Sequence, residues 1–232
     1  MRKDFLKGVS DGFPIGLGYF SVAVAFGILA VGAKISAFFA WLISATNLTS
    51  AGQTAGVGVI AAGGTLIEMA LTQLVINLRY ALMGFSLTQK LDKSFTTPKR
   101  LLLAFGITDE IYAVAASKKE KISAPYMAGL LILPFIGWTG GTLTGALASQ
   151  LLPEFIANAM GIMLYGMFFA IFIPEAKKSR PILLSVIIAV ALSVVFKYLL
   201  TFISGGFAII FSGLVAAAVC ALIFPVKEEE EK

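Results

Sequence analysis

The stretch Thr65–Leu87, TLIEMALTQLVINLRYALMGFSL, decides the fold. At about 1.5 Å of rise per residue, a helix of this length reaches about 34 Å, enough to cross a bilayer core of about 30 Å. Yet the run carries Glu68, Gln73, Asn77 and Arg79. A charge near the bilayer centre costs at least about 2.5–3.5 kcal/mol. This helix therefore cannot face lipid all round, because its polar groups need protein or water beside them.

Glu68 and Arg79 lie on one face of this helix but about 16 Å apart along its axis, so we do not expect them to pair with each other. Each then needs a partner elsewhere, which favours a polar cavity inside a helix bundle. The alternative interpretation is that each residue only forms an ion pair that holds helices together.

Composition places the chain among all-α, polytopic integral membrane proteins. Of its 232 residues, 58% are hydrophobic and 13% are charged, about half the charged share of a soluble protein. The net charge of +5 comes from residues between apolar runs, so it does not indicate a nucleic-acid partner; the lipid bilayer is the expected surroundings. With no histidine and one cysteine, Cys220, we expect no disulfide within the chain, no metal centre, no cofactor and no enzymatic activity.

We predict a single transmembrane domain over residues 1–232 with about eight hydrophobic helical segments, some of them broken or re-entrant, and a charged cytosolic tail at 226–232. The predicted segments are 13–32, 35–62, 65–87, 101–116, 126–147, 155–173, 182–203 and 207–224. Gly8, Gly12 and Gly16 recur every four residues, a spacing that lets helix backbones approach closely in lipid.

The second segment has an unusually polar middle. Residues 44–53 read SATNLTSAGQ, with more glycines following. We expect an interrupted helix here, whose freed backbone groups line a cavity as in the discontinuous helices of transporters. A continuous helix packed tightly through serine and threonine is the alternative.

Weak internal similarity appears at an offset of 118 residues, where Arg79-Tyr80 aligns with Lys197-Tyr198. It predicts repeat halves at 1–116 and 119–232, a feature of secondary transporters, although apolar sequences also match by chance. Basic clusters indicate that both termini and the loops 89–100, 117–121 and 175–180 are cytosolic. This orientation holds for the first half if 35–62 and 101–116 make no net crossing, or if one basic loop departs from the rule, so we expect six to eight true crossings.

Polar residues inside the apolar runs are the candidates for chemistry. A zwitterionic amino acid needs donors for its carboxylate and acceptors for its ammonium group, and the ends of broken helices supply both. Carboxylates inside a membrane can also carry a proton during transport. We predict substrate contacts at Asn47, Gln53, Asn77, Arg79 and Trp138, and ion-coupling roles for Glu68, Asp109 and Glu110.

A series of short motifs over roughly residues 8–175 resembles the AzlC family of branched-chain amino acid permeases. The motifs are Pro14 with its glycine neighbours, Ala51-Gly52-Gln53, Asn77-Leu78-Arg79 with Leu82 and Ser86-Leu87, Thr108-Asp109-Glu110, and Trp138 with Gly141 and Gly145. The Asn-Leu-Arg and Thr-Asp-Glu elements are the most specific. Tyr80 stands where members of the family often have histidine.

The resemblance implies a secondary transporter in the cytoplasmic membrane that exports branched-chain or related hydrophobic amino acids, driven by an ion gradient. It also implies a small membrane partner of the AzlD type. A channel, or a structural or sensory membrane subunit that transports nothing, is the alternative.

Overall fold

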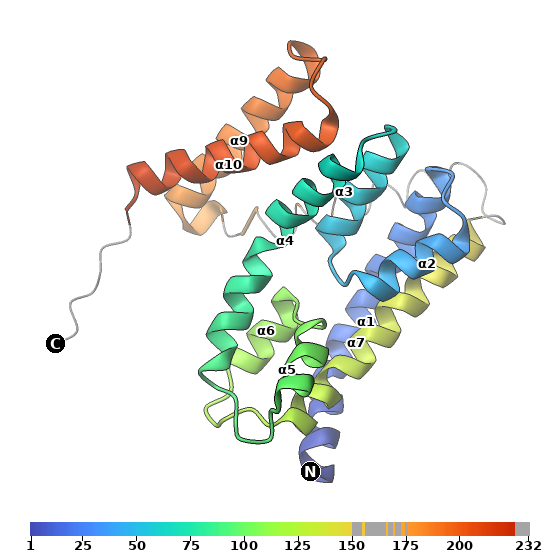
Figure 1. Ribbon diagram of the computed structural model, residues 1–232, viewed down its shortest axis with the longest axis vertical. Helices are drawn as coiled ribbons and strands as arrows, with labels where there is room; N and C mark the ends of the chain where they lie inside the picture. Colours follow the sequence, from blue (N-terminus) through green and yellow to red (C-terminus); the bar gives the residue numbers. More distant parts are fainter. Residues whose placement is uncertain (150–154, 156–165, 167–168, 170–172, 175, 226–232) are drawn as a thin grey trace. The chain divides into compact units, whose positions relative to one another are not determined.

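The computed structural model describes residues 1–149, 155, 166, 169, 173–174 and 176–225. These residues form helices and one isolated β-bridge between Leu91 and Ile122 (Figure 1). The chain divides into two compact units: unit 1 comprises Met1–Val57 and Ile76–Leu164, and unit 2 comprises Gly58–Val75 and Tyr165–Lys232. The helices in order are α1 (Arg2–Gly32), α2 (Ala37–Thr46), α3 (Ser50–Ala61), α4 (Leu66–Thr88), α5 (Thr97–Ala104), α6 (Asp109–Ala116), α7 (Ala124–Ala148), α9 (Arg180–Tyr198) and α10 (Gly205–Ile223).

The prediction of an all-helical, multi-pass membrane protein is confirmed. Within the described residues, α1, α4, α7, α9 and α10 are long and apolar enough to cross a membrane. The count of about eight segments and the two-fold repeat are not confirmed. The predicted segment 155–173 lies almost entirely outside the described residues, and the tail 226–232 lies wholly outside them.

The predicted boundaries are close where one apolar run makes one helix. The stretch 65–87 becomes α4, and 126–147 becomes α7. The start of the first segment at residue 13 is wrong, because α1 begins at Arg2. Its extra polar turns are anchored at Asp11, whose Oδ2 lies 2.7 Å from Lys118 Nζ and accepts a hydrogen bond from the Tyr126 hydroxyl.

The core of unit 1 is the contact between α1 and α7, which lie side by side (Figure 1). A Cβ atom on Gly8 would collide with the backbone of Tyr126 and Leu130, and one on Gly27 would collide with the backbone of Thr142 and Ala146. Early residues of α1 thus face early residues of α7, so the two helices run parallel. The predicted packing role of the glycines in α1 is confirmed, because only glycine permits this approach.

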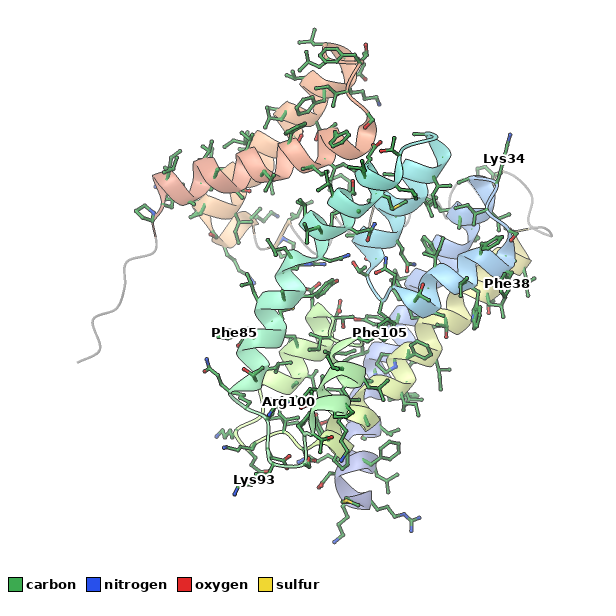
Figure 2. All side chains as sticks on the ribbon, in the orientation of Figure 1. Lys34, Phe38, Phe85, Lys93, Arg100 and Phe105 are labelled. Carbon is green, nitrogen blue, oxygen red and sulfur yellow. The ribbon has the colours of Figure 1, made fainter. Side chains whose placement is uncertain are left out.

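The basic loops gather at one end of unit 1. Lys90 Nζ donates to the carbonyl groups of Ala116 and Lys118, and the backbone N–H of Asp92 donates to Ile122. The segment α5–α6 therefore starts and ends at the end of unit 1 where α1 and α7 begin, as its predicted lack of a net crossing requires. Figure 2 shows Lys93 and Arg100 at this end and Lys34 at the opposite end of α1.

Two segments are broken into short helices. The run 35–62 is interrupted between Thr46 and Ser50, as predicted. The run 101–116 is also interrupted, between Ala104 and Asp109. With 10 and 12 residues, α2 and α3 reach about 15 and 18 Å, and the 8 residues of α5 and of α6 reach about 12 Å. Each is too short to cross a bilayer core of about 30 Å alone.

Candidate functional site

The break between α2 and α3 puts a polar turn beside the α1–α7 core. Asn47 ends α2 in an extended conformation. The Thr49 side chain then caps α3 by accepting a hydrogen bond from the backbone N–H of Gly52 at 3.2 Å. A threonine at this position satisfies a backbone N–H that has no partner within the helix, so the local sequence favours a new helix start here.

Four buried side chains join this break to α7. Gln53 Nε2 donates to Ser44 Oγ at 3.2 Å, and Ser44 Oγ lies 2.7 Å from Thr142 Oγ1. Trp138 Nε1 donates to Gln53 Oε1, also at 3.2 Å. All four residues are at most 3% exposed. Burying an amide, two hydroxyls and an indole N–H is tolerable only because they satisfy one another.

Tyr19 on α1 extends this group of contacts to α6. Its ring packs edge-on against Trp138, with centroids 5.1 Å apart. Its hydroxyl donates to Glu110 Oε2 at 2.5 Å and lies at the same distance from Thr108 Oγ1. Thr108 also caps α6, because its hydroxyl accepts from the backbone N–H of Ile111. The N-terminus of α6 is a favourable place for an acidic side chain such as Glu110.

Arg79 and Asp109 form an ion pair next to Glu110. Arg79 Nη1 lies 2.9 Å from Asp109 Oδ2, and Arg79 Nη2 donates to the Tyr80 hydroxyl at 3.1 Å. The side chains of the pair are 46% and 41% exposed, so the pair contributes little to stability. Asp109 lies outside the five candidate spans. Burial raises the pKa of its carboxyl group above the ordinary value, and the positive charge of Arg79 opposes that shift.

The contacts from Ser44 to Glu110 form one continuous series, and the Arg79–Asp109 pair adjoins it because Asp109 directly precedes Glu110 in the chain; we call the whole group the Tyr19 network. Its members are Ser44, Gln53, Thr142, Trp138, Tyr19, Thr108, Glu110, Asp109 and Arg79. All of them belong to unit 1. The network runs from fully buried hydroxyl and amide groups to an exposed ion pair, so it contains donors, acceptors, both signs of charge and two aromatic faces.

The network contains five of the eight residues predicted from the sequence: Gln53, Arg79, Asp109, Glu110 and Trp138. Asp109 and Glu110 reach different partners, as expected for adjacent residues of a helix. Asn47 and Asn77 are half-buried in unit 1, Asn47 at the α2–α3 break and Asn77 on α4.

Glu68 belongs to unit 2, whereas the other predicted carboxylates, Asp109 and Glu110, belong to unit 1. It is 3% exposed, and its Oε1 accepts hydrogen bonds from Ser204 Oγ at 2.5 Å and from the backbone N–H of Gly206 at 2.9 Å. Its partners are therefore the first residues of α10. The expectation that Glu68 and Arg79 find separate partners is confirmed.

Tyr19, which connects the two halves of the network, was not predicted from the sequence, and neither were Ser44, Thr108 and Thr142. A signal for Tyr19 exists in the sequence. Tyrosine is enriched where membrane helices meet the headgroups, whereas Tyr19 stands well inside an apolar run. A phenol at such a depth needs a hydrogen-bond partner.

Comparison with known proteins gives the chain its family. The sequence model described as AzlC protein matches residues 14–152, more than half of the chain. The chain belongs to the AzlC family. The matched region contains every member of the Tyr19 network, whereas α9 and α10 lie outside it.

Relatives of this AzlC protein are membrane proteins. The inner membrane protein YgaZ of Escherichia coli is 30% identical over 196 residues, which cover 82% of this chain and 80% of that protein. An uncharacterized membrane protein of Archaeoglobus fulgidus is 29% identical over 175 residues, covering 75% and 76% of the two chains. One from Helicobacter pylori is 27% identical over 184 residues, covering 76% and 79%. No solved structure matches the chain.

Proposed function

We propose that this AzlC protein is a secondary transporter that exports branched-chain or related hydrophobic amino acids across the cytoplasmic membrane. One observation carries the proposal. An unbroken series of contacts leads from the buried amide of Gln53, through Trp138 and Tyr19, to the carboxylate of Glu110, and the ion pair of Arg79 with Asp109 stands at the adjacent residue of the chain. Apolar side chains could stabilise a membrane protein equally well, so stability alone does not account for this series of polar groups.

The chemistry of the network suits a zwitterion with an apolar side chain. Arg79 offers a guanidinium to a carboxylate, and Glu110 offers an acceptor to an ammonium group. The faces of Tyr19 and Trp138 offer an apolar wall. Gln53 supplies an amide that can donate and accept, and Asn47 and Asn77 in the same unit are further substrate contacts in this proposal.

Coupling and gating are assigned to the exposed end of the network. In this proposal Asp109 or Glu110 carries the coupling proton or ion, and the Arg79–Asp109 pair opens and closes during alternating access. The pair suits this role because an ion pair that is nearly half-exposed contributes only about 0–1 kcal/mol, so it can break without unfolding the unit. A role of Glu68 in ion coupling stays a prediction.

The partner and the orientation follow from the family and the loop charges. We propose that a small membrane subunit of the AzlD type assembles with this chain. We also propose that both termini are cytosolic. The gathering of Lys90, Lys118 and the start of α1 at one end of unit 1 supports a common side for these segments.

The test is counterflow of labelled leucine and valine in proteoliposomes, with and without the small subunit, at two pH values. We expect saturable, gradient-dependent flux. Asn77→Ala and Asp109→Asn should each lower it about tenfold or more, a barrier change of about 1.4 kcal/mol. Glu120→Gln is the matched control, because Glu120 is an exposed carboxylate in the loop before α7 and should leave flux unchanged.

Three outcomes would contradict the proposal. Flux that does not saturate and ignores gradients would indicate a channel. No flux of any amino acid in a folded complex with the small subunit would indicate a structural or sensory subunit. Wild-type flux in both variants at normal expression would remove Asn77 and Asp109 from the mechanism.

A further inference from the structure

Unit 2 contains a cavity that the Tyr19 network does not use. It has a volume of about 490 Å³, within the range of about 300–1,000 Å³ typical of sites for small organic ligands. The described residues that line it are Thr65, Glu68, Phe202, Ile203, Ser204, Phe207 and Phe211. We call it the Glu68 cavity. Its walls are aromatic and aliphatic, and its one charged group is a carboxylate.

The Glu68 carboxylate is fixed in place from one side only. Ser204 and Gly206 both donate to Oε1, whereas Oε2 accepts no hydrogen bond from any described residue and packs beside Gly64, where a Cβ atom would lie 2.8 Å from it. The chain makes room for the group, because a Cβ atom on Gly206 would lie 2.7 Å from Glu68 Cγ and 3.0 Å from Cδ. Capping of α10 thus satisfies the hydrogen-bonding capacity of Oε1, whereas Oε2 has no donor among the described residues.

The carboxylate has no cationic partner in the described part of the chain. No ion pair joins it to lysine or arginine there, and the described lining of the cavity contains no lysine or arginine. A buried acidic group without a counter-ion is costly in an apolar environment. A cation that enters the cavity would remove that cost.

The side chains that line the cavity favour an organic cation over a metal ion. The Phe207 and Phe211 rings are stacked, with centroids 6.3 Å apart, and Phe202 contributes a third ring to the lining. Phenyl faces attract organic ammonium ions through the ring quadrupole. Ca²⁺ or Mg²⁺ would instead need about six oxygen ligands, and the described lining offers one carboxylate and two hydroxyls.

We propose that the Glu68 cavity binds an organic ammonium ion, with the ammonium group against Glu68 Oε2 and its carbon substituents against Phe202, Phe207 and Phe211. The ammonium belongs to a free hydrophobic amine or to an ammonium-bearing lipid headgroup. The described residues that form this site belong to unit 2, whereas those of the proposed transport site belong to unit 1.

The test uses benzyltrimethylammonium as the probe, with equilibrium dialysis of the labelled ion against the purified full-length protein in maltoside detergent. We expect saturable binding. Glu68→Gln should weaken it about tenfold or more, because it removes the charge while the amide oxygen still accepts from Ser204 and Gly206. Phe207→Leu should weaken binding about three- to tenfold and leaves the cap of α10 intact.

Two controls locate the site. Glu120→Gln should bind the probe as the wild type does. Glu110→Gln is the second comparison: if it abolishes binding and Glu68→Gln does not, the ammonium ion binds at the Tyr19 network and the proposal is wrong. Equal affinity in the wild type, Glu68→Gln and Phe207→Leu would overturn it as well.

A second arm distinguishes the two sources of the ammonium group. The probe is titrated against the protein in nanodiscs of phosphatidylglycerol alone and in nanodiscs with added phosphatidylethanolamine. Weaker probe binding in the mixed nanodiscs identifies the lipid headgroup as the occupant. Unchanged binding identifies a free amine, and both results keep the site at Glu68.

Discussion

The α1–α7 pair and the α9–α10 pair are both built from long apolar helices, but they are held together differently. Between α1 and α7, glycines such as Gly27 and Gly145 bring backbone against backbone. Between α9 and α10, rings such as Phe196 and Phe211 fill the space, 6.3 Å apart, and no residue of α9 is buried. Small residues make a fixed spacing, whereas aromatic side chains make an adjustable one.

The backbone contacts between α1 and α7 also explain why the polar residues of the Tyr19 network lie on this pair of helices. Tyr19 and Trp138 project from the fixed pair, so their mutual geometry is set by backbone contacts on both sides of them. Substrate-binding groups need such rigid support to keep their distances. The α9–α10 pair, in contrast, has a polar link to α4 through Glu68 and leaves a cavity there. Four substitutions test the comparison, from the largest effect to the smallest.

Gly145→Val should have the largest effect. A Cβ atom at this position would lie 2.8 Å from the Val24 carbonyl carbon and 2.9 Å from its Cα, so α1 and α7 would have to separate. We expect a loss beyond the about 1–3 kcal/mol of an ordinary overpacked core, measured as the yield and melting temperature of the detergent-solubilised protein. Gly140→Ala is the control on the same helix, because nothing lies within 4 Å of its Cβ position. Equal destabilisation by both would show that the close contact does not hold unit 1 together.

Tyr19→Phe should follow in size. It keeps the ring against Trp138 and removes the hydroxyl that bonds to Glu110. We expect a loss of about 1 kcal/mol in stability and a drop of about tenfold or more in leucine counterflow, because the network is cut in its middle. Tyr112→Phe is a matched control, since the Tyr112 hydroxyl contacts Ser86 outside the network. Normal flux in Tyr19→Phe would mean that the two halves of the network act separately.

Much of the fold could be predicted because hydropathy is local. The segments at 65–87 and 126–147 match α4 and α7 closely, and the polar, glycine-rich residues 44–53 correctly indicated a break. The pairing of α1 with α7 could not be predicted, since glycine spacing shows that a helix packs closely but does not name the partner.

The candidate site was predictable to the extent that its members are costly in a membrane. Charged and amide groups such as Gln53, Arg79 and Glu110 stand out in an apolar run, so they were found. Tyr19 was missed because an aromatic ring suits an apolar run, and only its hydroxyl needs a partner. The pairing of Glu68 with the start of α10 could not be predicted, because periodicity gives the face of a helix and not the element that covers it.

Glu68→Ala should have a moderate effect on stability, confined to the α9–α10 pair. It leaves Ser204 and the Gly206 N–H without their acceptor, so we expect a loss of about 1 kcal/mol, as for a removed helix cap. Glu68→Gln should lose less, because its amide oxygen still accepts. The check is hydrogen exchange at the start of α10, with the α1–α7 amides as the internal reference. Faster exchange in α1 and α7 as well would show that the two pairs do not unfold independently.

Gly213→Ala should have the smallest effect and the opposite sign. Gly213 lies in α10, and a Cβ atom there would meet nothing within 4 Å. Alanine restricts the unfolded chain and favours the helix, so we expect a gain of about 0.5–1 kcal/mol, read as a higher melting temperature in detergent. The same change at Gly16, where a Cβ would lie 2.8 Å from the Leu133 carbonyl oxygen, should destabilise instead. The opposite signs follow from the open space beside Gly213 and the backbone contact at Gly16. If Gly213→Ala were stabilising in isolation but weakened assembly with the small subunit, this face of α10 would be the surface on which that subunit packs.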